Sequence, residues 1–388
     1  MAANELSFNQ ISTVLNSIAQ QATGQANLAA VDTSSFITVA QTVLKTGYDP
    51  VMTAISQVLD RTIFSIRPYT AKFRGLEMTN AQFGNHTRKI NYVDNTWDDS
   101  KIVPLTDGTS IDAWEVKKPK VLQTNFYGQN VFQDHYTVFD DQLDVAFRGP
   151  DELAQFWSGV TQNMSDRIEQ AYEMQAREAL GNFIGGKVAA DNGVIHLLTE
   201  YNTATGLNLT AATVMQPANF KPFVEWVRAR VGYLVRLLSE RSALYHINVT
   251  GKTVMRHTPF DRQKFYLSSQ WFEALTSMAY ADTFNDQYLR FADDEQVNYW
   301  QAIETPDKIN VTASYLTDTG TIATAEAAEI GPIFGVIFDE EAIGMSLYDN
   351  RVAAAPYNPA GHYNNIWFSF RLRHYNDFSE QGLVLLLD

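Results

Sequence analysis

Residues 150–184 read PDELAQFWSGVTQNMSDRIEQAYEMQAREALGNFI, and this stretch decides the fold prediction. Pro150 suits a first helical turn, where its missing N–H costs nothing, and the two acids after it face the positive end of the helix dipole. Apolar residues then recur at steps of three and four, as on one face of a helix: Leu153, Phe156, Trp157, Val160, Met164, Ile168, Ala171, Tyr172, Ala179, Leu180 and Phe183. We expect Gly185 and Gly186 to end the helix.

The predicted helix is long for a chain of this size. At 1.5 Å per residue it measures roughly 50 Å, whereas a compact domain of this length has a radius of gyration of about 21 Å. We therefore expect the helix to act as a spine. An ordinary long core helix is the alternative.

Composition limits the class of protein. The chain has 388 residues, which predicts one large or two medium domains, and 45% hydrophobic residues indicate a globular protein. Cysteine is absent, which excludes disulfides, thiolate metal sites and a cysteine nucleophile. The N-terminus lacks the features of a signal peptide, and no apolar run is long enough to cross a bilayer.

The net charge of −15 bears on possible partners. DNA and anionic lipid are repelled by such a surface as a whole, so sequence-specific nucleic-acid binding is not expected. An acidic wall to which DNA does not adhere is compatible with this charge.

Residues 84–127 predict an extended two-stranded ribbon. Residues 86–93 and 113–126 read as strands, and the long connection 94–112 between them shows little periodicity, which is typical of a functional loop. Large side chains near the tip stay exposed unless a partner covers them: Trp97, Ile102, Val103, Leu105, Ile111 and Trp114. Acids lie at the tip and basic residues on the arms: Asp98 and Asp99, then Arg88, Lys89, Lys117, Lys118 and Lys120.

The rest of the chain reads as mixed helix and strand. Residues 1–45 predict one or two weak amphipathic helices with a break near Gly24, or a mobile tail. Helices are expected from Asn219 and within 259–280, and a loop-rich crossing over 187–206. Strands are predicted at residues 243–249, 308–315, 333–338, 344–348, 365–374 and 382–387.

No motif for chemistry is complete. Gly251-Lys252-Thr253 resembles the end of a phosphate-binding loop, but His246 stands where that loop requires glycine. The histidines show no metal-binding spacing, and adjacent acids on a strand point to opposite faces. We predict no catalytic, cofactor-binding or metal-binding residues.

The order of these segments resembles a tailed-bacteriophage major capsid protein, closest to the small podophage type. Most of the likeness lies in residues 127–173, YGQNVFQDHYTVFDDQLDVAFRGPDELAQFWSGVTQNMSDRIEQAYE. The strand-rich residues 335–387, GVIFDEEAIGMSLYDNRVAAAPYNPAGHYNNIWFSFRLRHYNDFSEQGLVLLL, look like the part that closes the peripheral domain in that family.

The resemblance implies an α+β capsid fold and a division of the chain. The implied parts are an N-terminal arm and helices (1–83), an extended loop (84–127), a peripheral domain (126–209 and 331–388) with its spine helix (150–184), and an axial domain (210–330).

The function implied is that of a structural subunit, not an enzyme, which self-assembles into an icosahedral capsid around double-stranded phage DNA. Its implied partners are itself in hexamers and pentamers, a portal protein at one vertex, and DNA without sequence-specific binding. A separate scaffolding protein is expected because little chain precedes the ribbon. No membrane or cofactor is implied, and assembly is expected in the bacterial host cytoplasm. A cellular nanocompartment shell and an unrecognised hydrolase are the alternatives.

Two sets of contact residues follow from the resemblance and the charge pattern. The extended loop is expected to contact a neighbour through Trp97, Asp98, Asp99, Ile102, Leu105 and Trp114. In the axial domain, basic residues of one subunit are expected to face acids of the next, through Arg228, Arg236, Asp293 and Asp294.

Overall fold

The computed structural model describes residues 8–24, 30–46, 50–55, 71–78, 86–93, 114, 120–127, 130–273 and 294–388. The chain divides into two compact units, each assembled from separate segments. The first unit takes Met1–Arg74, Gln129–Gln175 and Ser346–Arg373, and the second takes Gly75–Gly128, Ala176–Met345 and His374–Asp388. The predicted boundaries of the arm, peripheral and axial domains remain predictions.

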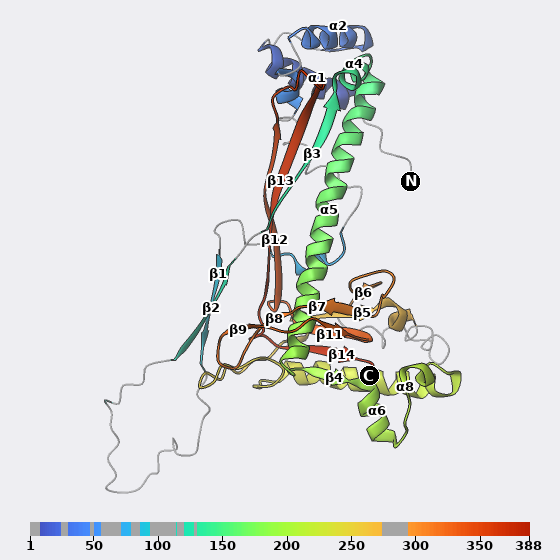
Figure 1. Cartoon of the computed structure of the whole chain (residues 1–388), viewed down its shortest axis with the longest axis vertical. Coiled ribbons are helices and arrows are strands. Elements are labelled where there is room, and N and C mark those ends of the chain that lie inside the picture. Colours follow the sequence, from blue (N-terminus) through green and yellow to red (C-terminus); the bar gives the residue numbers. More distant parts are fainter. Residues whose placement is uncertain are drawn as a thin grey trace. The chain divides into compact units, whose positions relative to one another are not determined.

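The first unit combines N-terminal helices with a three-stranded sheet in the order β12-β13-β3 (Figure 1). Its elements are α1 (Phe8–Thr23), α2 (Thr33–Leu44), β3 (Asn130–Phe139), α4 (Asp140–Ala146), and parts of α5 (Pro150–Ala189), β12 (Ile343–Ala354) and β13 (Tyr363–Asn376). Strand β13 alternates between buried and half-buried residues as predicted, because one face of the sheet packs inward. On that inner face the rings of Phe132 and Phe370 stack at 5.3 Å.

Helices α1 and α2 pack on each other within the first unit. Leu15 and Ile18 of α1 and Phe36 and Val43 of α2 are completely buried. The predicted break after the first helix is confirmed, since α1 ends before Gly24, whose φ of +70° suits glycine.

One carboxylate ties the segment before the ribbon to α5. Glu169 accepts a hydrogen bond from the backbone N–H of Ala71 at 2.9 Å and forms an ion pair with Arg74. The Arg74 guanidinium also lies over the ring of Tyr172, 4.3 Å from its centroid. Glu169, which lies on the polar face of the helix, is therefore buried and binds the segment that contains Ala71 and Arg74.

The predicted long helix is present as α5, but its end differs from the prediction. Helix α5 contains 40 residues and continues to Ala189, past the expected stop at 184. A Cβ atom at Gly185 would lie 2.7 Å from Val311 Cγ1 and 2.8 Å from Ala313 Cβ, and one at Gly186 would overlap the Phe378 ring. The two glycines therefore permit close packing inside the helix and do not terminate it.

The second unit is built on a five-stranded sheet in the order β4-β14-β11-β5-β6. Its strands are β4 (Val194–His196), β5 (Gln263–Ser268), β6 (Asp294–Val297), β11 (Ile333–Asp339) and β14 (Gly382–Leu386). Strand β4 pairs in parallel with β14, and β6 pairs in parallel with β5. The central strand β11 pairs antiparallel with both β14 and β5. Every residue of β11 and of β14 is buried, because helices cover both faces.

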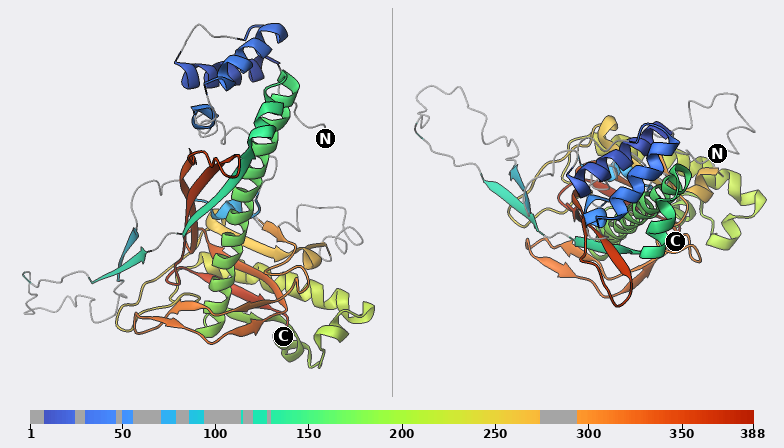
Figure 2. Two further views of the ribbon diagram at one scale, coloured as in Figure 1. Left: turned by 45° about the horizontal axis from the view of Figure 1, so that its top comes forward. Right: turned by 90° about the horizontal axis from the view of Figure 1, so that it is seen from above.

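Helices lie on the two faces of this sheet (Figure 2). Helices α6 (Leu197–Thr205) and α8 (Pro217–Ser239), joined through α7 (Ala211–Val214), form one hydrophobic core with Ile337 and its neighbours. Phe338 follows Ile337 on β11 and therefore lies on the opposite face of the sheet, where Phe183 of α5 packs on it. Two small hairpin-like pairs complete the unit: β7 (Ile309–Val311) with β10 (Ala328–Ile330), and β8 (Ser314–Leu316) with β9 (Ile322–Thr324).

Several local predictions in this unit were wrong. Residues 187–206 contain β4 and α6 where a loop-rich crossing was expected. The helix expected within 259–280 is present at residues 269–273, but the buried strand β5 at residues 263–268 precedes it and was not predicted. Helix α8 begins at Pro217 with Gln216 as its cap, before Asn219. Residues 243–249 form an irregular loop where a strand was expected, because His246 Nε2 bonds the carbonyl of Val254 at 2.7 Å.

A buried lysine lies at the end of α5. Lys187 is completely buried and donates to the carbonyl of Tyr245 at 2.8 Å and to Asn192 Oδ1 at 3.2 Å. Burial lowers the pKa of its ammonium to about 7, although the charge of Asp377 opposes this. The amine is therefore largely neutral in the folded protein above neutral pH.

Candidate intersubunit surfaces

The predicted ribbon is confirmed where the structure describes it. Strands β1 (His86–Tyr92) and β2 (Val121–Tyr127) pair antiparallel over seven residues, with His86 opposite Tyr127 and Tyr92 opposite Val121. The second strand, β2, begins at Val121, whereas a strand over residues 113–126 was predicted. Because successive residues face opposite sides, the ribbon has an outer face with Ile90 52%, Tyr92 67% and Val121 40% exposed.

The inner face of the ribbon contains a charged residue, Lys89, that is held by carboxylates of its own unit. Lys89 Nζ lies among three carboxylates: it contacts Glu380, and it is 2.9 Å from Asp377 Oδ2 and 3.1 Å from Glu341 Oε2. Burial by itself lowers the pKa of Lys89, but Asp377 and Glu380 outweigh this effect, so its pKa is raised above the ordinary value. Lys89, one of the basic residues on the arms, is therefore paired within its own subunit.

The carboxylates around Lys89 are shared with two arginines. Arg256 Nη2 is 2.9 Å from Glu380 Oε1, and Arg262 Nη2 is 2.5 Å from Glu341 Oε1. Burial alone raises the pKa of Glu341, but hydrogen bonding to Arg262 and the charge of Lys89 lower it overall. Glu341 and Glu380 each contact an arginine as well as Lys89, whereas Asp377 forms its ion pair with Lys89.

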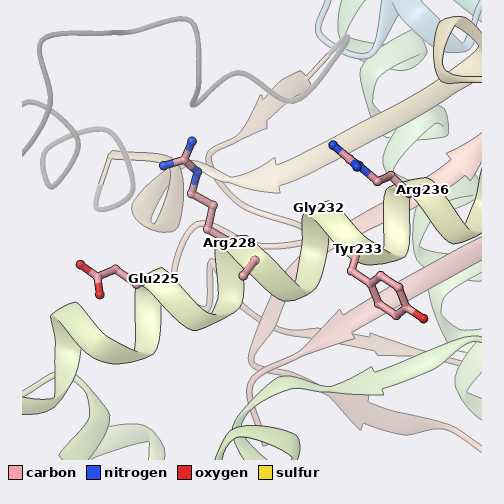
Figure 3. A pocket seen from close by; sticks show the side chains of 6 residues that line it. Glu225, Arg228, Gly232, Tyr233 and Arg236 are labelled. Atoms are coloured by element: carbon pink, nitrogen blue, oxygen red, sulfur yellow. The ribbon is translucent and has the colours of Figure 1, made fainter.

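Helix α8 exposes a basic face. Arg228, Gly232 and Arg236 follow at intervals of four residues and so share one side of the helix. They line a hollow of about 540 Å³ together with Glu225 and Tyr233. Figure 3 shows both guanidinium groups on one side of the helix and the Tyr233 ring on the other. A Cβ atom at Gly232 would meet nothing within 4 Å, so the glycine leaves space between the arginines.

Arg230, on the same helix, is already paired within the subunit. Its Nε and Nη2 atoms donate to Glu200 at 2.7 and 3.0 Å, a bidentate geometry. This hydrogen bonding raises the pKa of Arg230. Arg230 is therefore not part of the basic face formed by Arg228 and Arg236.

Among the described residues, no group of three His, Cys, Asp or Glu residues could hold a metal ion. Lys252 lies in a tight turn bridged to Val249 and is not followed by a helix, so the incomplete phosphate-loop motif has no structural support. Burial lowers the pKa of His374, which is typical of a histidine packed in a core.

Comparison with known proteins decides the family. The sequence profile of the Phi29-like phage major capsid protein family matches residues 15–373. The chain belongs to this family. It is a structural subunit of a phage capsid shell and is located in the virion capsid.

Solved structures support the capsid fold. A chain of the capsid structure of Staphylococcus phage Andhra is 11% identical, with a TM-score of 0.57, covering 84% of this chain and 86% of that one. A chain in the structure of the head fibre and inner core protein gp22 of native bacteriophage P68 is 12% identical, with a TM-score of 0.55 and the same two coverages. A search of curated proteins finds no significant match.

The structure tests only part of the contact residues predicted for the capsid subunit. Five predicted loop residues lie outside the described residues: Trp97, Asp98, Asp99, Ile102 and Leu105. Trp114 is described and 88% exposed. Asp293 also lies outside the described residues, as does the side chain of Asp294, which begins β6, so their pairing with Arg228 and Arg236 stays a prediction.

Sequence reasoning missed the carboxylates that bind the ribbon. Asp377 and Glu380 lie in the connection between β13 and β14, almost 300 residues after Lys89. A weak signal exists, since Asp377, Ser379, Glu380 and Gln381 interrupt an otherwise strand-forming, apolar C-terminus.

No helix in the described part of the capsid subunit is long and apolar enough to span a membrane.

Proposed function

We propose that this capsid subunit builds its shell from hexamers and pentamers, using the ribbon as a clasp on the adjacent subunit. The supporting observation is the outer face of β1 and β2, where Ile90 and Tyr92 are exposed although a free two-stranded ribbon is marginal in water. The loop contacts Trp97, Asp98, Asp99, Ile102, Leu105 and Trp114 belong to the same proposal. Burying such side chains is worth about 1.5–3 kcal/mol each.

A second proposed contact lies on α8. Its support is the hollow at Gly232 between Arg228 and Arg236, which has the size and charge for a carboxylate-bearing segment. The proposed occupant is the acidic segment around Asp293 and Asp294 of a neighbouring subunit. Such charge pairs steer association more than they strengthen it.

The remaining partners are proposed from the family and the charge of the chain. A separate scaffolding protein and a portal protein at one vertex are proposed partners, with assembly in the bacterial host cytoplasm. The net charge of −15 supports enclosure of double-stranded DNA without sequence-specific binding. The subunit is proposed to have no catalytic turnover.

Negative-stain electron microscopy of the expressed protein, alone and with candidate scaffolding proteins, tests this proposal. Hollow closed particles with hexameric and pentameric units are expected. Discrete small oligomers under every condition would contradict the proposal. A metal- or nucleotide-dependent activity that copurifies with the particles and disappears on substitution of His374 or Lys252 would contradict the absence of catalysis.

A further inference from the structure

The described part of the ribbon is attached to the rest of its unit through its inner face. On its inner face Phe126 packs on Tyr375, with ring centroids 4.6 Å apart. Lys89 is the charged group on that face, and its side chain is 19% exposed. A two-stranded ribbon has no core of its own, so its direction is set by such contacts.

The three carboxylates around Lys89 come from two connections of the second unit. Glu341 lies between β11 and β12, while Asp377 and Glu380 lie between β13 and β14. Asp377 and Glu380 are nearly completely buried, unlike Glu341. Charge-assisted hydrogen bonds to several acceptors at once restrict a lysine to one position much more than a single exposed pair does.

The carboxylate site is itself rigid. The N–H of Asp377 donates to the carbonyl of Ala342 at 2.7 Å, and Ser379 Oγ donates to Asp377 Oδ1 at 2.6 Å. The N–H of Asp339, at the end of β11, donates to the carbonyl of Gln381 at 3.0 Å. The site is therefore held by the central strand of the sheet, and a group bound to it takes the orientation of that sheet.

We propose that Lys89 is a positioning residue: by binding Glu341, Asp377 and Glu380 it fixes the direction in which the ribbon leaves the subunit. The inference rests on the proposed function of the ribbon as a clasp, because a fixed direction presents the outer face of β1 and β2 in one orientation to a neighbour. Arg88, the preceding residue, faces outward and is exposed, so it has no part in this anchoring.

The chain contains no cysteine, so two introduced cysteines can be spin-labelled without background. We would label Gln123→Cys on the outer face of β2 and Ile303→Cys, a residue 72% exposed in the same unit, in unassembled subunits. Pulsed electron paramagnetic resonance then measures the distribution of distances between ribbon and sheet. The parent protein is expected to give one narrow distribution, Lys89→Met a clearly broadened one, and Lys89→Arg a largely restored one.

Two controls separate positioning from stability. Arg88→Met removes a neighbouring outward charge, and Leu234→Ala destabilises the buried face of α8; both are expected to leave the distribution narrow. If Lys89→Met fails to fold, Glu380→Gln, which leaves Asp377 and Glu341 as acceptors, is expected to give partial broadening. An unchanged distribution in Lys89→Met, or in Glu380→Gln where that variant is used, overturns the proposal.

Particle yield provides the second readout. Lys89→Met is expected to reduce closed particles at least tenfold under conditions in which Arg88→Met assembles normally. If Lys89→Met broadens the distribution but assembles as the parent does, a fixed ribbon direction is not required for assembly and that part of the inference is refuted. If the parent itself forms no closed particles, the proposed clasp function fails, whereas the distance measurement still decides the role of Lys89.

Discussion

The two glycines near the end of α5 make a quantitative prediction, with Gly181 as a matched control. Gly181, one turn earlier on the same helix, would place a Cβ atom in open space, whereas Gly185 would place it 2.7 Å from Val311 Cγ1 and 2.8 Å from Ala313 Cβ. We expect Gly181→Ala to stabilise the subunit and Gly185→Ala to destabilise it. Both substitutions gain the same helix propensity, up to about 1 kcal/mol.

The difference between the two variants therefore isolates the cost of overpacking. Ala313 is 1% exposed and its Cβ is fixed to the backbone, so no change of rotamer can relieve the contact. Overpacking of this kind costs about 1–3 kcal/mol. We expect the free energy of unfolding of Gly185→Ala to lie below that of Gly181→Ala by about 1–3 kcal/mol.

Urea unfolding of unassembled subunits, followed by circular dichroism and tryptophan fluorescence, measures this difference. The slope of free energy against urea should be unchanged, so that the midpoints can be compared directly. Equal stabilisation by both substitutions would refute the packing argument.

Three further predictions follow from the same structure. Replacing Lys187 by Met should remove part of the pH dependence of stability, because the folded amine is neutral above about pH 7 while the unfolded one keeps its proton to about pH 10.5. Between these pH values the free energy of unfolding of the parent should rise relative to that of the variant by at most about 1.4 kcal/mol per pH unit. A difference between the two proteins that stays constant in urea titrations at several pH values would disprove this. Replacing residues 94–112 by an Asn-Gly turn should leave circular dichroism nearly unchanged while closed particles fail to form or lose stability; outright unfolding, or shells as stable as the parent's, would contradict the clasp. The double reversal Arg228→Glu with Arg236→Glu should slow assembly, most at low salt, and light-scattering kinetics that do not change across a salt series would count against the α8 contact.

The elements foreseen correctly are those with a strong local period. The three- and four-residue steps of 150–184 and the two-residue alternation of 365–374 predicted α5 and β13, because one buried face imposes its period on the sequence. The paired strands of the ribbon also followed from local pattern. The likeness of the whole order to the capsid family was likewise readable without a structure, and the family profile confirms it.

The elements missed are short and buried on both faces. Residues 263–268, QKFYLS, form a six-residue strand between two others, and a segment this short has no clear period that separates strand from helix. Their state is decided by β11, which pairs with them from about 70 positions later in the chain.

Sequence by itself thus determined the class of protein, the long helix, the ribbon and the absence of any complete catalytic motif, since each of these depends on composition or on neighbours within a few residues. Tertiary structure alone decided that Gly185 permits a close approach, that Lys187 is buried and neutral, and that Lys89 binds Asp377 and Glu380. In each case the deciding atoms belong to residues more than 50 positions away. Such contacts leave no local period, because the free energy that selects them is gained only once the chain has folded.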